Sequence, residues 1–438
     1  MKILLIGSGA REQMIAKKLS ESKHQPEIIV FGLSLNPGIE KLVHLYHIGN
    51  LLDNEAIINF ARENKPDFAV IGPEAPIANG VVDELMKINV PSASPTRKMG
   101  QLESSKGFTR ELLLKHHIEG NPRFQVFTNE EGLMAFAEDL EEIVVKADGL
   151  HGGKGVLVQG DHFETLEEGV EAAKKFIKSD GQVVIEEKLV GQEFSLMSFV
   201  DGEHVVDMPT IQDHKRAFKG DTGPNTGGMG AYSYPDRLPF LKSEDVQAAH
   251  DITVKVAKAL QEELGDPFIG IMYGGFMITK NGVRLIEYNA RFGDPEAMNA
   301  LTLLETDLVD IFRAQIDGTL DQLDIKFKNL ATVCKYVVPE GYPNDPVKGE
   351  RIELGEIPDG VDYYLASIDQ VGDDLLMLGS RAIAFVAAAE KTDQAEQLVE
   401  KAISNIKGAV FHRKDIGTKA LIEKRIKMME GLNDSITS

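Results

Sequence analysis

The chain has 438 residues, of which 42% are hydrophobic and 26% are charged, a composition typical of folded proteins and not of disordered ones. Its formal net charge of −22 disfavours nucleic acids and anionic membranes as partners, because an acidic surface repels both. A single cysteine, Cys334, excludes a disulfide framework and a cysteine-rich zinc site. No apolar stretch approaches the ~18 residues that cross a membrane, so we expect a cytoplasmic protein of about two to four domains.

Short apolar runs alternate with helical patterns over residues 1–103. Strands are expected at 3–6, 27–31 and 68–71. Helices are expected around Met14 and after Asp53, whose carboxylate is a typical N-cap. The first run ends at Ile6 and is too short for the apolar core of a signal peptide. Strands separated by helices favour a parallel sheet, so this region is predicted to be an N-terminal α/β domain.

The pattern changes to mixed α+β over residues 104–320, the second predicted domain. Strands are expected at 143–146, 183–187 and 283–289. Thr165 and Glu168 have the spacing of a capping box, which predicts a helix between the first two of these strands. Five glycines among residues 220–230 favour a loop there.

Residues 326–438 form the third predicted domain, an α+β unit. Its strands are expected at 332–338 and 382–388, and a closing helix begins near Thr418. The apolar pattern around Cys334 predicts that this side chain lies in the core. The whole chain is thus expected to be a multidomain α/β and α+β protein.

A glycine turn follows the first strand and precedes the first helix. Backbone N–H groups at such a turn bind phosphate well. A dinucleotide fingerprint would need a third glycine at the position of Glu12, and an acidic residue where Gly32 follows the second strand. A nicotinamide-dependent oxidoreductase is therefore an alternative, while Arg11 favours a substrate phosphate.

Residues 146–156 combine a strand-ending lysine, Lys146, with a glycine-rich loop that carries Lys154. No Gly-Lys-Ser/Thr sequence occurs in the loop, so it is not a Walker loop. Backbone amides and Lys154 could instead clamp a triphosphate from above. A surface hairpin with solvated lysines is the alternative.

Residues 186–193 leave the second strand of the central region. A free backbone edge in this segment could pair with an adenine, and the carboxylate of Glu193 could accept hydrogen bonds from a ribose. A charged and exposed strand end is the alternative.

Glu287, Asn289 and Arg291 are spaced to lie on one face of a strand. Two hard oxygen donors suit Mg²⁺, which takes one or two protein ligands together with phosphate oxygens. Arg291 beside them could hold the γ-phosphate in the transition state. A salt-bridged face exposed to solvent is the alternative.

Residues 213–216 and 221–230 form a polar, glycine-rich stretch that could close on a small ligand. A flexible linker is the alternative, although Pro224 and Asn225 favour a shaped turn.

Taken in chain order, these features resemble the ATP-grasp superfamily, in which two α+β lobes close on ATP. More narrowly, the chain resembles the phosphoribosylamine–glycine ligase family, also called glycinamide ribonucleotide synthetases. The segments that carry the resemblance are 7–12, 72–77, 146–156, 212–216, 221–232, 289–296 and 411–417. They span nearly the whole chain, and 221–232 together with 289–296 is highly specific to this ligase family.

The resemblance implies an ATP-dependent carbon–nitrogen ligase of de novo purine biosynthesis. The enzyme would join glycine to 5-phosphoribosylamine through a glycyl phosphate, and would use ATP with Mg²⁺ or Mn²⁺. It would act as a monomer or small homo-oligomer on small molecules, without nucleic acid or membrane. The family architecture implies a phosphoribosylamine-binding domain at 1–103, a two-lobed ATP-grasp domain at 104–320 whose lobe at about 122–190 moves, and a C-terminal capping domain at 326–438.

The resemblance also implies roles for individual residues. ATP would contact Lys106, Lys146, Gly152, Gly153, Lys154, Glu186, Glu187, Lys188, Leu189 and Glu193. Glu287 and Asn289 would bind the metal. The catalytic residues would be Arg291, Asp294, Asp213 and Lys215. The two other substrates would contact Gly9, Arg11, Glu74, Thr222, Gly223, Pro224, Asn225, Gly227 and Gly228.

Four residues depart from the family pattern. Ala10 replaces a usual glycine, Gln13 a usual histidine, His151 a usual small residue, and Gly275 a glutamine of some relatives. They affect substrate contacts and the number of metal ligands rather than the reaction class. Another ATP-grasp carboxylate–amine ligase or carboxylase, an oxidoreductase built on the first sheet and a non-enzymatic binding protein are the remaining alternatives. The favoured interpretation requires that Glu287 and Asn289 face the cleft that holds Lys146.

Overall fold

The computed structural model describes residues 1–152 and 154–434. Its first sheet has four parallel strands in the order β3–β2–β1–β4, namely Leu45–Ile48, Glu27–Gly32, Lys2–Ile6 and Phe68–Ile71. The helices of this region are α1 (Ala10–Ser20), α2 (Pro37–Glu40), α3 (Asn54–Asn64), α4 (Glu74–Ala78) and α5 (Val81–Met86). The parallel N-terminal sheet is therefore confirmed, and Asp53 caps α3 by accepting from the Ala56 N–H at 3.0 Å.

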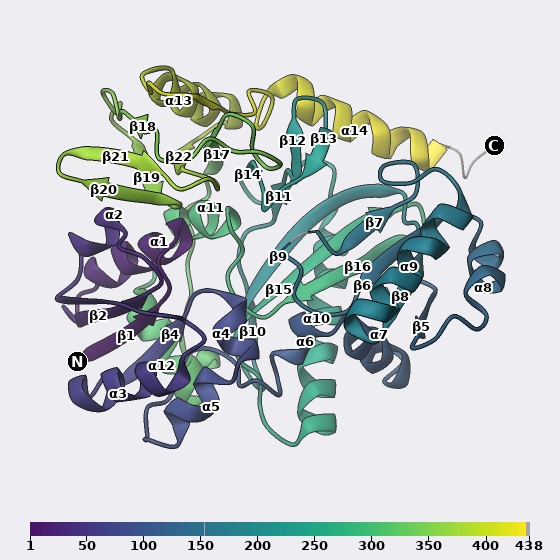
Figure 1. Ribbon diagram of the computed structural model, residues 1–438, viewed down its shortest axis with the longest axis horizontal. Helices are drawn as coiled ribbons and strands as arrows, with labels where there is room; N and C mark the ends of the chain where they lie inside the picture. The colour runs from purple at the N-terminus through teal and green to yellow at the C-terminus, as the bar shows by residue number, and fades with distance from the viewer. Residues whose placement is uncertain (153, 435–438) are drawn as a thin grey trace.

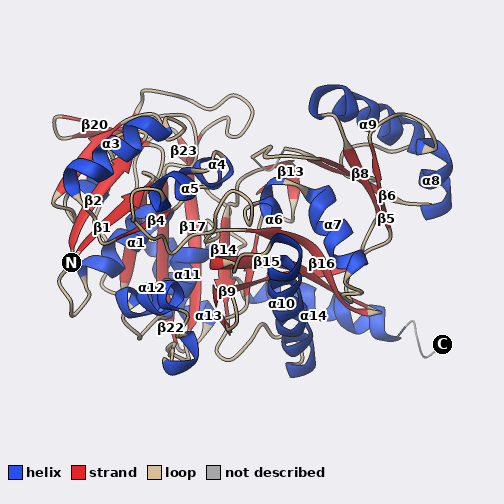
Figure 2. Ribbon diagram, turned by 90° about the horizontal axis from the view of Figure 1, so that it is seen from below, coloured by secondary structure: helices blue, strands red, loops and turns tan. Residues whose placement is uncertain are grey.

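A second sheet forms a separate lobe, seen at the upper right of Figure 2. Its antiparallel strands follow the order β5–β8–β6–β7, namely Phe124–Phe127, Val183–Glu187, Ile143–Ala147 and Val156–Val158. Helices α8 (Leu133–Leu140) and α9 (Leu166–Asp180) pack on it and close a core of its own. The predicted capping box begins α9, where Thr165 accepts from the Glu168 N–H.

The largest sheet is antiparallel and crosses the middle of the molecule (Figure 1). Its main path is β16 (Gly282–Asn289), β15 (Ile269–Thr279), β9 (Gly191–Asp201), β11 (Ile211–Asp213), β14 (Gly230–Ser233), β17 (Ala331–Pro339), β22 (Ile383–Ala389) and β19 (Val361–Leu365). Two short strands join its sides, β10 (Val205–Asp207) on β9 and β23 (Val410–Phe411) on β17. The C-terminal strands thus extend the sheet of the central region. Cys334 on β17 is fully buried, as predicted.

The remaining helices surround this sheet. They are α6 (Gln101–Ser104), α7 (Lys106–Lys115), α10 (Ser243–Leu264), α11 (Glu296–Leu303), α12 (Leu308–Asp317), the 3₁₀ helix η1 (Leu320–Gln322), α13 (Thr392–Ser404) and α14 (Lys419–Asp434). A small sheet, β18–β21–β20, consists of Arg351–Ile352, Asp374–Met377 and Ile368–Val371. Among the described residues, none of the helices is both long enough and apolar enough to cross a membrane.

The prediction of a loop at residues 220–230 is wrong. The segment contains β13 (Thr222–Asn225), which pairs with β12 (Arg216–Phe218), and it ends where β14 begins. Its glycines serve close packing as well as turns. A Cβ on Gly223 would collide with the Phe218 ring, and one on Gly230 would collide with the Cys334 carbonyl oxygen. Glycine content alone does not separate these two uses.

Asn36 joins the N-terminal sheet region to the C-terminal strands. Its buried Nδ2 donates to the carbonyl oxygens of Ser8 (3.0 Å) and Leu365 (2.7 Å). Its Oδ1 accepts from the N–H groups of Gly38 and Ile39. One amide therefore satisfies backbone groups from three segments.

We expect Asn36→Ala to lower the free energy of unfolding by about 2 kcal/mol, because it leaves several buried backbone groups without partners. Urea denaturation monitored by circular dichroism measures the change. Exposed Asn59 is the control, and Asn59→Ala should change the free energy by less than about 0.5 kcal/mol. Equal stability of the two variants would contradict the assigned role.

Candidate active site

The candidate site begins at a bulge in β16. Gly275 pairs with Glu287 and Phe276 pairs with Leu285, so Ile286 is left out of the ladder. The carbonyl oxygen of Ile286 accepts from Lys146 Nζ at 2.7 Å and from Arg110 Nη2 at 2.6 Å. Bulges re-aim strand residues, and here the bulge attaches the lysine of the lobe to the central sheet.

Glu287 lies next to this bulge among several cations. Its Oε1 is 3.4 Å from Lys215 Nζ. Burial raises the pKa of a carboxyl group, but Lys215, followed by Lys146 and Lys106, lowers the pKa of Glu287 to about 2. The charge on Glu287 is therefore maintained at neutral pH, on the side of the strand that lies near Lys146.

Asn289 ends β16, and Arg291 lies beyond the strand rather than on it. The two side chains still meet, because Arg291 Nη2 donates to Asn289 Oδ1 at 3.2 Å. Arg291 also forms ion pairs with Glu103 at 3.0 Å and with Glu74 at 3.4 Å. Sequence analysis did not select Glu103, and no local motif marks it.

The predicted phosphoribosylamine residues lie next to Arg291. Arg11 donates from Nη1 to the Phe292 carbonyl oxygen at 3.0 Å and from Nε to Glu12 at 2.7 Å. Glu12 in turn accepts from the Gly9 N–H at 2.6 Å. The glycine turn of the first sheet is thereby joined to the segment that follows β16.

The glycine-rich loop of the lobe is tied to the start of α7. Lys106 Nζ donates to the Gly149 carbonyl oxygen at 3.0 Å. Asp148 accepts from the Ser105 hydroxyl at 2.9 Å and from the Gly107 N–H at 3.0 Å. Further along the loop, Gly152 and Lys154 are exposed, and the predicted contact Gly153 lies outside the described residues.

Side chains of the predicted adenine segment are already engaged by protein groups. Buried Glu186 pairs with Arg110 at 2.6 Å and with Lys146 at 2.8 Å. Glu187 Oε1 accepts from the Arg123 N–H at 2.8 Å, and Lys188 pairs with Glu142 at 2.8 Å. Leu189 is half-buried at the end of the segment. The side chain of Glu186 therefore positions Lys146, and its backbone lies between Phe124 and Val144 of the two neighbouring strands.

A small cavity beside Lys215 brings several predicted residues together. It is lined by Glu193, Phe194, Ser195, Asp213, Lys215, Tyr273, Gly275, Phe276, Ile286 and Glu287. Nearby carboxylates, first Glu287 and also Glu193 and Asp213, raise the pKa of Lys215. The candidate ribose residue Glu193, one candidate metal ligand and two candidate catalytic residues thus share one pocket, whereas Asn289, Arg291 and Asp294 are not among the residues that line it.

A second acid, Glu296, lies close enough to Asp213 to affect its pKa. Burial, and then the charge of Glu296, raise the pKa of Asp213 well above its usual value. Glu296 accepts hydrogen bonds from Tyr273 and, at 3.3 Å, from Ser195. The segment 289–296 carries part of the family resemblance, but the sequence analysis assigned no role to Glu296.

Asp294 is held by Arg381, which comes from the C-terminal region. The Arg381 guanidinium donates to Asp294 Oδ2 at 2.9 Å and to three carbonyl oxygens, those of Gly227 (2.8 Å), Gly228 (3.1 Å) and Asp294 itself (2.9 Å). It lies over the Tyr336 ring, whose hydroxyl donates to Asp294 Oδ1 at 2.6 Å. No motif in the sequence singled out Arg381.

The other predicted residues of this stretch lie further along the β12–β13 hairpin. Exposed Thr222 pairs with Phe218, and Gly223 packs against the same ring. Pro224 and Asn225 are half-buried, and Asn225 Nδ2 lies 3.3 Å from His162 Nε2 of the lobe. Gly227 and Gly228 therefore join Asp294, whereas Thr222 and Gly223 lie at the opposite end of the hairpin.

A lobe whose Lys146 contacts the central sheet, and a carboxylate and an amide near the end of β16, agree with the resemblance to the ATP-grasp class of enzymes. Family models support a narrower assignment. The N, ATP-grasp and C domains of phosphoribosylglycinamide synthetase match residues 1–103, 104–297 and 332–419.

Curated relatives and a solved structure agree with this assignment. Phosphoribosylamine–glycine ligase of Methanocella arvoryzae is 44% identical over 99% of this chain and 100% of its own length. The enzyme of the same name from Methanocaldococcus jannaschii is 45% identical, again over 99% and 100%. The crystal structure of phosphoribosylamine–glycine ligase from Thermotoga maritima superposes with a TM-score of 0.80 at 26% identity, covering 95% of this chain and 100% of that one.

The chain therefore belongs to the phosphoribosylamine–glycine ligase family of ATP-grasp enzymes, and it is an ATP-dependent ligase. Among the departures from the family pattern, Gln13 has a structural contact, because its Oε1 accepts from the Leu365 N–H at 2.6 Å. Ala10 is buried at the start of α1, and His151 pairs with Asp180 at 3.2 Å. Gly275 lies opposite Glu287.

We expect Arg381→Met to lower kcat/KM of the ligase reaction about 100-fold, because four charge-assisted hydrogen bonds that fix Asp294 and Gly227–Gly228 are lost. Arg381→Lys should recover only a small part, since one ammonium group cannot replace the planar fork. Steady-state kinetics measure both variants, with exposed Arg351→Met as the control. Full activity of Arg381→Lys would contradict the geometric requirement.

Proposed function

We propose that this ligase joins glycine to 5-phosphoribosylamine in two steps. A glycine carboxylate oxygen attacks the γ-phosphorus of ATP, the bond to the β-phosphate oxygen breaks, and glycyl phosphate and ADP form. The ribosylamine nitrogen then attacks the carbonyl carbon, and phosphate leaves with the former carboxylate oxygen. The products are glycinamide ribonucleotide, ADP and phosphate, as in purine biosynthesis.

One observation carries this proposal: Glu287, Lys215 and Asp213 share a pocket that Lys146 of the lobe approaches through the bulge. Two anions, a triphosphate and a carboxylate, must meet for the first step, and cations in a buried site lower the cost of bringing them together. The family membership of the chain supports the choice of substrates.

The chemistry of Glu287 and Asn289 fits a divalent metal, Mg²⁺ or Mn²⁺. A carboxylate that stays ionised and an amide oxygen are hard donors, and Gly275 opposite Glu287 adds no side chain to the space. The bound ion would supply charge neutralisation at the phosphate oxygens. Lys215 would then exchange part of its contact with Glu287 for substrate oxygens.

Lys106, Lys146 and the glycine-rich loop with Gly152, Gly153 and Lys154 would hold the phosphates. Glu186–Leu189 would line the adenine, and Glu193 would accept from the ribose hydroxyls. The lobe at about 122–190 would move against the central sheet, since it has its own sheet and core. We propose that the functional domains comprise residues 1–103, 104–320 and 326–438.

Glycine would bind between Asp294, Arg291 and the loop at Gly227–Gly228, with Thr222, Gly223, Pro224 and Asn225 contributing through the hairpin. Gly9, Arg11 and Glu74 would receive phosphoribosylamine. The ion pair between Glu74 and Arg291 supports this arrangement, because it joins the two substrate regions. Asp213, beside Glu296, is suited to take the proton that the amine releases.

We propose a cytoplasmic enzyme that acts on small molecules as a monomer or small homo-oligomer. Its high negative charge disfavours nucleic acid and anionic membrane as partners.

We expect Glu287→Gln to retain the fold but to lower ATP turnover at least about 1,000-fold, because a neutral amide replaces the charged metal ligand. ADP release is measured at several Mg²⁺ and Mn²⁺ concentrations, and thermal unfolding checks the fold. Exposed Glu305→Gln is the control. Normal turnover by Glu287→Gln would contradict the metal assignment.

Trapping of the acyl phosphate tests the reaction itself. With ATP, glycine and hydroxylamine but no phosphoribosylamine, the enzyme should form glycine hydroxamate and ADP in equal amounts. Formate, bicarbonate and other amino acids serve as competing carboxylates. If another carboxylate is activated and glycine is not, the chain belongs with a different ATP-grasp reaction.

A further inference from the structure

The β12–β13 hairpin carries residues of the candidate site at both of its ends. Lys215 immediately precedes β12, and Thr226–Gly228 follow β13. Thr226 connects the two ends, since its N–H and its hydroxyl both donate to the Lys215 carbonyl oxygen, at 2.7 and 2.8 Å. Any displacement of the hairpin therefore moves Lys215 and the Gly227–Gly228 loop together.

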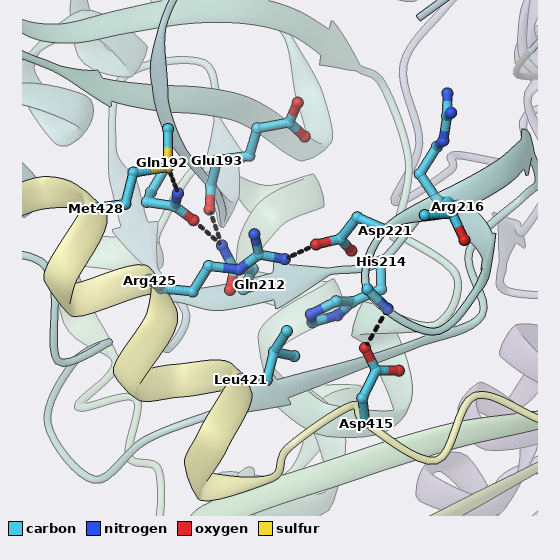
Figure 3. A network of polar contacts seen from close by, with 12 residues as sticks. Gln192, Glu193, Gln212, His214, Arg216, Asp221, Asp415, Leu421, Arg425 and Met428 are labelled. Carbon is cyan, nitrogen blue, oxygen red and sulfur yellow. Dashed lines mark hydrogen bonds and ion pairs between the residues drawn. The ribbon is translucent and has the colours of Figure 1, made fainter.

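Two arginines from the C-terminal end of the chain hold the turn of this hairpin. Asp221, in the turn, accepts from Arg413 Nη2 at 3.1 Å and from Arg425 Nη2 of α14. Arg413 also donates to the Arg216 carbonyl oxygen on β12 at 3.0 Å. Figure 3 shows Arg425 reaching from α14 to Asp221. Both the turn and the first strand are thus attached to residues 413–425.

Two arginines and two aspartates form this contact, and a buried histidine lies among them. Asp415 pairs with Arg413 at 2.8 Å and accepts from the Gly220 N–H at 2.9 Å. His214 is buried within the set, and burial together with the charges of Arg413 and Arg425 lowers its pKa to about 3. Removal of one arginine therefore leaves a partly buried carboxylate undercompensated.

The same helix also lies against the strand that carries Glu193. Gln192 Nε2 contacts Met428 Sδ of α14 at 2.6 Å. Gln212 donates to the Glu193 carbonyl oxygen at 2.9 Å and accepts from the Tyr232 hydroxyl at 2.7 Å. Figure 3 shows Gln192, Glu193, Gln212 and Met428 beside Arg425.

We propose that Arg425 and Arg413 are positioning residues for the glycine half of the reaction, acting through Asp221 on the hairpin that carries Lys215 and Gly227–Gly228. Among the residues that the structure describes, neither guanidinium has a hydrogen bond to a candidate metal ligand or a predicted ATP residue. The expected change in the KM for glycine rests on the proposed function. The expected change in the mobility of the hairpin rests on the geometry alone.

The experiment compares Arg425→Met with Lys424→Met, an exposed neighbour on the same helix. Hydrogen–deuterium exchange of the full-length protein should show faster exchange at residues 214–228 in Arg425→Met, with the lobe at 122–190 unchanged. The KM for glycine should rise about tenfold, while the KM for ATP stays within about twofold. Lys424→Met should match the wild type in every measurement.

Two further variants separate positioning from general stability. Arg425→Lys keeps a cation near Asp221 and should restore most of the glycine KM. Asp221→Asn should be at least as severe as Arg425→Met, because Asp221 also pairs with Arg413. The double variant should be no worse than Asp221→Asn alone, because that change already removes the contact with Arg425. Equal changes in the two KM values, unchanged exchange at 214–228, or additive effects would overturn the inference. If exchange at 214–228 changes in an enzyme that does not activate glycine, the result would support the contact of the two arginines with the hairpin and would contradict the proposed function.

Discussion

The charge of the half-buried Glu287 is the constraint on which the site depends. Cations near this carboxylate keep it ionised, and they come from three places in the chain: Lys106 before the lobe, Lys146 in the lobe and Lys215 beside the hairpin. Each cation needs its own support. The β16 bulge holds Lys146 and the Gly149 carbonyl oxygen holds Lys106, while Thr226 at the end of the hairpin donates to the Lys215 carbonyl oxygen. The lobe and the central region therefore both contribute cations that lie near the Glu287 carboxylate.

A second set of contacts joins the three regions of the chain at the substrate side. Arg291 connects Glu74 of the N-terminal region with Asn289 at the end of β16, and Arg381 connects the C-terminal region with Asp294. Both guanidinium groups use several donors at once, which fixes orientation as well as distance. The amine substrate and the activated carboxylate could therefore meet in a pocket to which all three regions contribute residues.

The sequence was informative where chemistry and local spacing coincide. Glu287, Asn289 and Lys146 could be selected because a strand pattern and donor types appear together within a few residues. Arg381 and Arg413 could not, because their partners Asp294 and Asp221 lie 87 and 192 positions away. The β12–β13 hairpin was missed because glycines that allow close packing resemble glycines of a loop. Glu186 was placed at the adenine because no local signal shows that Arg110 and Lys146 engage its side chain.

The place of β17 in the large sheet has a consequence for biosynthesis of the protein. This strand lies between β14 and β22, so it closes an edge that the central region leaves open. While the ribosome has made only the first three hundred or so residues, β14 has no neighbour on that side, and unpaired edges invite association between chains. A productive catalyst can thus assemble only late in translation, and a shortened gene product would be prone to aggregate.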